Sequence, residues 1–259
     1  LTNNGGLAGL VMNAAGTLGF APEPRLHVDI AGLGAFLTNP VSLLPRTPAS
    51  GARYLPFPGG FLLHTGYPNP GLETVLRRNV PRWERSPIPV FVHLLGQSVD
   101  ELASMALRLE EISCVMGVEI GFPKDAEREL VRAFIQAACG ELPVIARLPF
   151  DQVEALAPAA LAAGAVAISL GAPRGVLPLP NGHLIEGRLY GPALFPQALG
   201  IVRSLAQVGF PVIGAGGVYS SAQAQSMLAA GALAVQLDAV LWRGSRLLLR
   251  DAVNIPPTQ

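Results

Sequence analysis

The chain has 259 residues, of which 50% are hydrophobic and 14% are charged. This composition can bury a large core and is sufficient for one large domain or two small ones. Lys plus Arg and Asp plus Glu each number 18, and the charges are scattered along the sequence. No long-range electrostatic field therefore favours nucleic acid or an anionic membrane surface, and we expect neither as a partner.

The apolar runs are too short to span a bilayer, which takes about 20 residues. The two cysteines, Cys114 and Cys139, lie in expected helical stretches without metal-ligand spacing, and no signal peptide precedes them. We expect reduced core thiols in a cytoplasmic protein, and no metal site.

Short apolar or β-branched runs recur along the chain, each followed by a turn and a stretch of helical period. The predicted strands are 7–12, 34–38, 89–94, 115–120, 143–148, 165–170, 211–214 and 234–237. Asn69 and the proline after it predict the start of a helix, and Ser98 with Glu101 forms a capping box. Further helices are expected near Asp125, Asp151, Gly191 and Ser220, and after Ala239.

Near-continuous apolar strands that alternate with helices predict a parallel sheet with both faces covered, and eight such units close a (β/α)8 TIM barrel. A doubly wound open sheet is the alternative. Residues 40–64 and 173–190 interrupt the repeat and are rich in Pro and Gly. We expect a hairpin or long loop there, after strands two and six, on the face where barrel enzymes build their active sites.

Five segments then form a recognisable series in chain order: NAAGTLGF (13–20), GLGAFLTNPVSLLPR (32–46), PGGFLLHTGYPNPGLE (58–73), YGPALFPQAL (190–199) and PVIGAGGVYSSAQAQSMLAAGALAVQ (211–236). The series resembles the dihydroorotate dehydrogenase family and covers nearly the whole chain. The resemblance implies one TIM-barrel domain over residues 1–259, with FMN at its top. Fold alone does not settle function, so each site residue needs its own check.

The resemblance also implies which residues meet the cofactor. The family passes small residues over the flavin ring and holds the phosphate with backbone N–H groups, where glycine lets the backbone approach. The matching positions are Ala14, Ala15, Gly16 and Thr17 for the ring, and Gly191, Gly216 and Gly217 for the phosphate. The alternative is that 214–217 is only a strand-to-helix turn.

Asp238 stands where the family has a glycine of the phosphate site. A carboxylate ~4 Å from a phosphate repels it by about 1 kcal/mol in water and by several in a partly buried site. FMN therefore requires that Asp238 points away, or that Arg243 or Arg246 neutralises it.

The family's two lysines near the flavin correspond to Asn39, which carries no charge, and to Arg147, which does. Arg147 is the best candidate for stabilising an anionic reduced ring. The alternative is a structural ion pair of Arg147 with Glu119 or Asp151.

The family's catalytic Cys or Ser loop after strand four is replaced here by GVEIGFPKDAE, so the usual base is missing. The asparagines that contact orotate align with Leu63-His64, Gly121 and Ala172-Pro173. Polar groups of dihydroorotate would be buried unpaired, at a cost of ~1–3 kcal/mol each. We therefore expect inefficient oxidation of dihydroorotate.

Other polar residues at the expected mouth could form a different site: His64 and His93 as catalytic groups, and Tyr67, Asn69 and Glu119 against the substrate. For three of them a structural role is the alternative. His93 and Glu119 suit hydrogen-bonded positions inside a barrel, and Asn69 suits a helix cap.

Three functions remain open. The first is an FMN-dependent oxidoreductase acting on a less polar ring or an enoyl-type small molecule. The second is a flavin-free barrel kept as a structural or regulatory subunit. The third is a lyase, aldolase or phosphate-sugar enzyme that uses the same mouth without flavin. That class needs a Schiff-base lysine or a metal cluster, and the sequence shows neither. In each case we expect a homodimer or a subunit of a larger complex.

Overall fold

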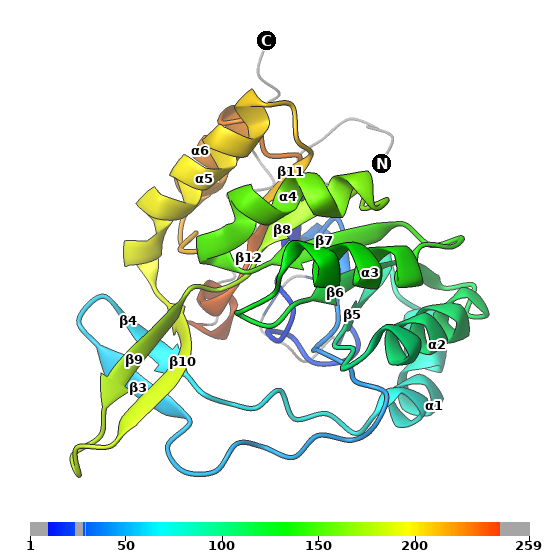
Figure 1. The fold of residues 1–259 in the computed structure, drawn as a ribbon, viewed down its shortest axis with the longest axis horizontal. Coiled ribbons are helices and arrows are strands. Elements are labelled where there is room, and N and C mark those ends of the chain that lie inside the picture. Colours follow the sequence, from blue (N-terminus) through cyan, green and yellow to red (C-terminus); the bar gives the residue numbers. More distant parts are fainter. Residues whose placement is uncertain (1–9, 24–27, 29, 244–259) are drawn as a thin grey trace.

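The structure is a computed structural model that describes residues 10–23, 28 and 30–243. Eight parallel strands form one sheet in the order β1-β12-β11-β8-β7-β6-β5-β2. The amide of Gly34 donates to the carbonyl of Val11 at 2.8 Å, and Met12 bridges Ala35 in parallel, so β1 and β2 meet and the sheet closes. An open doubly wound sheet would reverse its strand order. The predicted (β/α)8 barrel is therefore confirmed (Figure 1).

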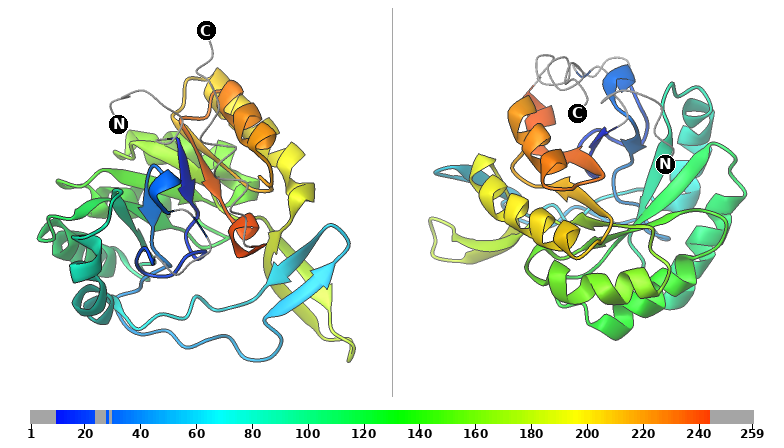
Figure 2. Two further views of the ribbon diagram at one scale, coloured as in Figure 1. Left: turned by 180° about the vertical axis from the view of Figure 1, so that it is seen from behind. Right: turned by 90° about the horizontal axis from the view of Figure 1, so that it is seen from above.

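The barrel strands lie within or close to the predicted runs. They are β1 Val11–Asn13, β2 Phe36–Leu37, β5 Val90–Leu94, β6 Val115–Gly121, β7 Val144–Leu148, β8 Ala167–Leu170, β11 Val212–Ala215 and β12 Ala234–Leu237. The beginning of the predicted strand 7–12 lies outside the described residues. Figure 2 shows the helices around the outside of this sheet, which explains why strands buried on both faces have almost continuous apolar sequences.

The α-helices are α1 Leu72–Trp83, α2 Val99–Glu110, α3 Arg128–Ala138, α4 Val153–Ala162, α5 Phe195–Gln207 and α6 Ser221–Ala229. Single 3₁₀ turns are η2 Ile30–Gly32, η3 Phe150–Gln152, η4 Pro192–Leu194 and η5 Ala239–Arg243. Two helices start on serine caps: Ser98 accepts from the amide of Glu101, and Ser220 accepts from the amide of Gln223. The predicted start after Ser98 and the one near Ser220 are thus confirmed.

The barrel interior has an apolar layer with a polar layer above it. The apolar layer is contributed by Met12, Ala15, Leu37, Phe91, Ile145, Ala167 and Ile213. Side chains two residues apart on a strand share a face, so the next inward positions lie nearer the carboxyl ends. These positions are polar: His93 comes two residues after Phe91, Arg147 two after Ile145, and Ser169 two after Ala167. The alternation places charged groups at the end of the barrel that carries active sites.

The two segments that interrupt the repeat pair with each other. β3 Tyr54–Phe57, β4 Gly60–Leu63, β9 Arg174–Pro178 and β10 Leu184–Tyr190 form an antiparallel sheet in the order β3-β4-β10-β9. This sheet stands beside the barrel in Figures 1 and 2. Hairpins after barrel strands two and six therefore combine into one platform near the cavity described below.

The cysteine prediction was wrong in two respects. Both cysteines are free, but Cys139 is exposed and Cys114 is only half-buried, so neither is a core thiol. Neither lies within a helix, since Cys114 precedes β6 and Cys139 caps the end of α3.

Among the described residues, no helix has the length and apolarity needed to cross a membrane. No group of three or more His, Cys, Asp or Glu side chains gathers there as a metal would require.

Candidate functional site

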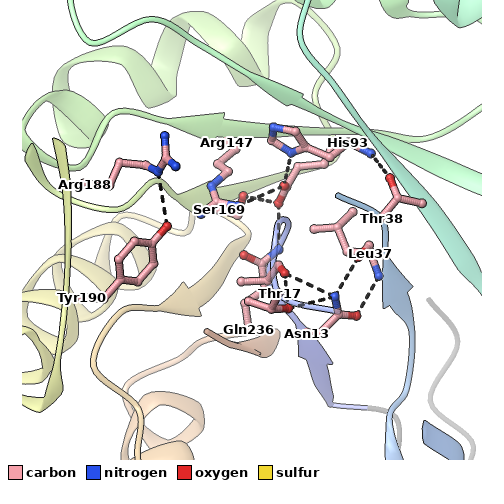
Figure 3. Close-up of polar contacts among 12 residues, drawn as sticks. Asn13, Thr17, Leu37, Thr38, His93, Arg147, Ser169, Arg188, Tyr190 and Gln236 are labelled. Atoms are coloured by element: carbon pink, nitrogen blue, oxygen red, sulfur yellow. Dashed lines mark hydrogen bonds and ion pairs between the residues drawn. The ribbon is translucent and has the colours of Figure 1, made fainter. Parts of the chain in front are cut away.

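Glu119 on β6 is the centre of the polar layer and is fully buried. Its Oε2 lies 2.6 Å from Nδ1 of His93, and its Oε1 accepts hydrogen bonds from Ser169 Oγ and Gln236 Nε2, both at 2.7 Å. Arg147 Nη1 lies 3.7 Å from Oε2. Figure 3 shows this cluster, to which β5, β7, β8 and β12 each contribute one side chain. One carboxylate therefore connects side chains from both sides of the barrel.

The protonation states in the cluster follow from burial and partners. Burial raises the pKa of Glu119, but the His93 hydrogen bond and the Arg147 charge outweigh it and hold the pKa at about 2. Burial lowers the pKa of His93 despite the neighbouring carboxylate. An ionised carboxylate only accepts hydrogen bonds, so the single proton of the neutral imidazole lies on Nδ1. The lone pair of His93 is therefore on Nε2, where it can take a proton.

His93 lines a cavity of about 200 Å³ at the carboxyl ends of the strands. Its Nε2 lies beside Gly121, where an added Cβ would come within 2.6 Å of the nitrogen. Only the absence of a side chain at position 121 leaves room for this imidazole. The cavity is also lined by Leu95, Phe122, Leu148, Pro149 and Phe150, and by the charged residues Lys124, Arg147, Asp151, Arg174 and Arg188. The lining thus combines apolar side chains with a predominantly basic set of charged ones.

Arg188 reaches this cavity from β10 of the antiparallel sheet. Its guanidinium stacks on the Tyr67 ring, with Cζ 3.8 Å from the ring centroid. Nη2 donates to Thr65 Oγ1 at 2.9 Å, and Nε makes a long contact of 3.4 Å with Tyr190 Oη. Tyr67 adopts a φ of 53°, the left-handed region that non-glycine residues seldom occupy. A strained turn on one hairpin therefore supports a charged side chain from the other.

The turn after β1 is held by its own polar side chains. Asn13 Nδ2 donates to the carbonyls of Ala14 and Leu37, and Thr17 Oγ1 donates back to the Ala14 carbonyl at 2.6 Å. Asn39 Oδ1 accepts the amide of Gly19 at 3.1 Å. Of the candidate ring-contacting residues 14–17, Ala14 lines a second, much smaller cavity, of about 10 Å³.

The second cavity also includes Gly216 and Asp238 in its lining. The Asp238 carboxylate accepts the backbone N–H of Ala239 at 2.6 Å, and the backbone N–H of Gly217 also acts to lower its pKa. Burial raises its pKa to about 6, against the lowering effect of these amides and of Arg147. A carboxylate of the chain itself therefore lies at the expected phosphate site and is already hydrogen-bonded to one backbone amide there, that of Ala239.

These contacts test how well the residues fit FMN. Gly216 and Gly217 have φ of 104° and 69°, and a Cβ on Gly217 would lie 2.4 Å from the amide nitrogen of Phe195, so glycine is required there. The small residue Ala14 and the cation Arg147 meet at the second cavity, as a flavin ring needs. The cavity is too small for the ring as it stands, and the Asp238 carboxylate occupies the amide of Ala239. FMN fits only when the Asp238 carboxyl moves away from the phosphate position and the cavity widens.

The remaining candidate residues have other positions. Gly191 begins the turn whose last residues, Leu194 and Phe195, pack against Gly217. His64 follows β4 and does not line either cavity; its amide donates to the Arg53 carbonyl. Asn69 is buried and exchanges hydrogen bonds with Ser42, and it also accepts the amide of Gly71 at the start of α1.

Sequence reasoning missed Arg188, Ser169 and Gln236. Ser169 and Gln236 could have been found from the strand alternation, because a polar residue inside an apolar barrel strand must face the interior. No local signal identifies Arg188, which was assigned to a loop. Arg246 and the side chain of Arg243, which the sequence suggested as partners of Asp238, lie outside the described residues.

A family model and several relatives of known name point to the same protein family. A family model described as dihydroorotate dehydrogenase matches residues 3–145. Three bacterial relatives share the name dihydroorotate dehydrogenase B (NAD(+)), catalytic subunit. The relative from Desulforudis audaxviator is 33% identical, with 87% of this chain and 80% of the relative covered. The relative from Pelobacter propionicus is 34% identical, with coverage of 89% and 84%. The relative from Trichlorobacter lovleyi is 33% identical, with coverage of 88% and 82%.

Proposed function

Since this chain belongs to the dihydroorotate dehydrogenase family, we propose that it is an FMN-dependent oxidoreductase that acts on a small molecule in the cavity beside His93. The observation that carries this proposal is the buried Glu119 cluster, which presents a neutral imidazole and a guanidinium at the mouth of the barrel. FMN, when bound, supplies the site that accepts a hydride from the substrate.

The residues of the chain divide the remaining work. His93 takes the substrate proton on Nε2, and Glu119 positions the imidazole through the Nδ1 hydrogen bond and stabilises the cation that forms. Arg147 contributes positive charge beside both cavities. Ala14 to Thr17, Gly191, Gly216 and Gly217 would surround FMN. His93 would thus supply the base that the family's Cys or Ser loop provides and that this chain lacks.

Dihydroorotate itself is a poor match. Gly121 and Ala172 line the cavity where the resemblance implies asparagines, and neither offers a side-chain hydrogen bond. A ring with several polar groups would lose its hydrogen bonds to water without full replacement. We therefore propose a less polar substrate than dihydroorotate.

A second function is supported by one specific observation. The amide of Ala239 is already bound to the Asp238 carboxylate, and the adjoining cavity is about 10 Å³. A flavin-free barrel that serves as a structural or regulatory subunit would have this arrangement. Relatives are named as catalytic subunits, so either function is compatible with assembly into a larger complex or a homodimer. Size-exclusion chromatography with light scattering would report the assembly.

FMN binding by the purified chain and by Asp238→Asn separates the two functions. Flavin fluorescence would follow the titration, with the exposed Asp125→Asn as a charge-matched control. We expect FMN affinity to rise about five- to tenfold in Asp238→Asn, because a like charge ~4 Å from the phosphate costs about 1 kcal/mol or more. Asp125→Asn should behave like the original chain.

If neither the original chain nor Asp238→Asn takes up FMN, the oxidoreductase proposal fails and the flavin-free subunit is supported. If both take it up equally, Asp238 does not face the phosphate. For a protein that binds FMN, slow or absent bleaching by dihydroorotate is expected, and rapid bleaching would refute the proposed substrate preference.

A further inference from the structure

We propose that Arg188 and Arg147 form a carboxylate-binding site, so that the ligand of the main cavity is a small, largely apolar mono-carboxylate. As a statement about the substrate, this rests on the proposed function. As a statement about binding, it rests only on the cavity and its charges. Figure 3 shows the two arginines entering the same region from β10 and β7.

The environment of Arg188 gives the first argument for this site. Arg188 is 8% exposed, and among the described residues it forms no ion pair with a carboxylate. Its recorded partners are two hydroxyls and an aromatic ring, which leave part of the guanidinium facing the cavity. A buried charge without a counter-ion is costly, and a bound anion would remove that cost.

The two arginines also act on each other. The Arg188 charge opposes protonation of Arg147 and of His93. Arg147 has Glu119 at 3.7 Å, which is longer than a hydrogen bond and leaves its donors incompletely used. A planar carboxylate between two guanidinium groups would satisfy both, since this geometry accepts paired N–H donors.

The charged side chains around the cavity sum to a net positive charge. Its lining includes four cations, Lys124, Arg147, Arg174 and Arg188, and one carboxylate, Asp151, which gives a net charge of +3. Glu119 and Glu186, which pair with three of these cations from outside the lining, reduce the sum to +1. Among the described residues, Arg188 is the one cation of this lining that has no ion pair with a carboxylate.

The apolar part of the lining determines the rest of the ligand. Leu95, Phe122, Leu148, Pro149 and Phe150 are apolar, and the cavity of about 200 Å³ holds a single ring or a short unsaturated chain. His93 lines the same space, so a ligand held by its carboxylate would place its apolar body against this nitrogen and these apolar side chains. The ligand class is thus an aromatic or unsaturated carboxylate rather than a phosphate ester or a polyol.

Calorimetric titration with benzoate and with benzamide, its neutral analogue of the same shape, tests this directly. The full chain is used as purified, after any bound flavin has been quantified. We expect benzoate to bind about tenfold or more tightly than benzamide, and Arg188→Gln to abolish that preference. Arg188→Lys, which keeps the charge but loses the paired donors, should retain part of it. Arg108→Gln, an exposed arginine on α2, should retain all of it.

Equal binding of benzoate and benzamide to the original chain would overturn the proposal, as would an unchanged preference in Arg188→Gln. Circular dichroism and melting curves accompany each variant, and if Arg188→Gln does not fold, Arg188→Lys decides the outcome through its intermediate affinity. The readout involves no redox step. A protein that binds benzoate but no FMN would refute the flavin proposal while supporting this one.

Discussion

Among the residues of the site, Glu119 is the one whose charge we expect to contribute most to the free energy of unfolding. It is fully buried with His93 and Arg147 beside it, whereas Glu186 pairs with Lys124 and Arg174 at the surface. Removing the charge of Glu119 leaves a buried arginine without its partner, but Glu186 is largely screened by water. We expect Glu119→Gln to lower the free energy of unfolding by about 3–5 kcal/mol and Glu186→Gln by less than about 1 kcal/mol. Urea denaturation would measure both, and similar losses would contradict this account.

Asp238 has the opposite effect on stability. Its folded pKa of about 6 lies above the ordinary value of 3.8, so the native state holds this proton more tightly than the unfolded state. The stability that protonation contributes is present below about pH 4 and is lost as the pH rises through about 6. We expect the stability of Asp238→Asn minus that of the original chain to grow across this window and then level off. Melting temperatures at several pH values would measure the difference; a flat difference would show that the carboxyl is not buried as described.

At the scale of the element, β6 depends on a glycine. A Cβ on Gly117 would lie 2.5 Å from the Phe91 ring and 2.9 Å from the Pro143 carbonyl, so this strand lies too close to its neighbours for any side chain. Overpacking of this kind costs about 1–3 kcal/mol, and we expect Gly117→Ala to destabilise the barrel by that amount. Met116→Ala, a change at a half-exposed position on the same strand, should have little effect. Chemical denaturation of the two variants tests the difference.

At the scale of the whole molecule, acid should open the barrel from its interior. The folded pKa values of His93 and Glu119 both lie below their ordinary values, so both groups contribute stability above those values. That stability is lost as the pH falls below 6.5 for His93 and from 4.5 towards about 2 for Glu119. We expect a sharp loss of stability in this acid range, and a weaker dependence below pH 4.5 in Glu119→Gln. Far-ultraviolet circular dichroism across the pH range would reveal it, and parallel curves for the two proteins would contradict the role of Glu119.

The sequence by itself predicted the barrel, because its apolar runs must be buried on both faces and eight such strand–helix units can close a barrel, but only the tertiary structure excluded the open doubly wound sheet, which buries its strands in the same way. It also indicated His93, Glu119 and Arg147 as candidate site residues, since ionisable residues are unusual inside apolar strands. Only the tertiary structure decided that Glu119 is ionised between His93 and Arg147, that Asp238 is buried and accepts the amide of Ala239, and that Arg188 enters the cavity. These facts depend on contacts between residues far apart in the chain, whereas local patterns record only which face of its own strand or helix a side chain occupies.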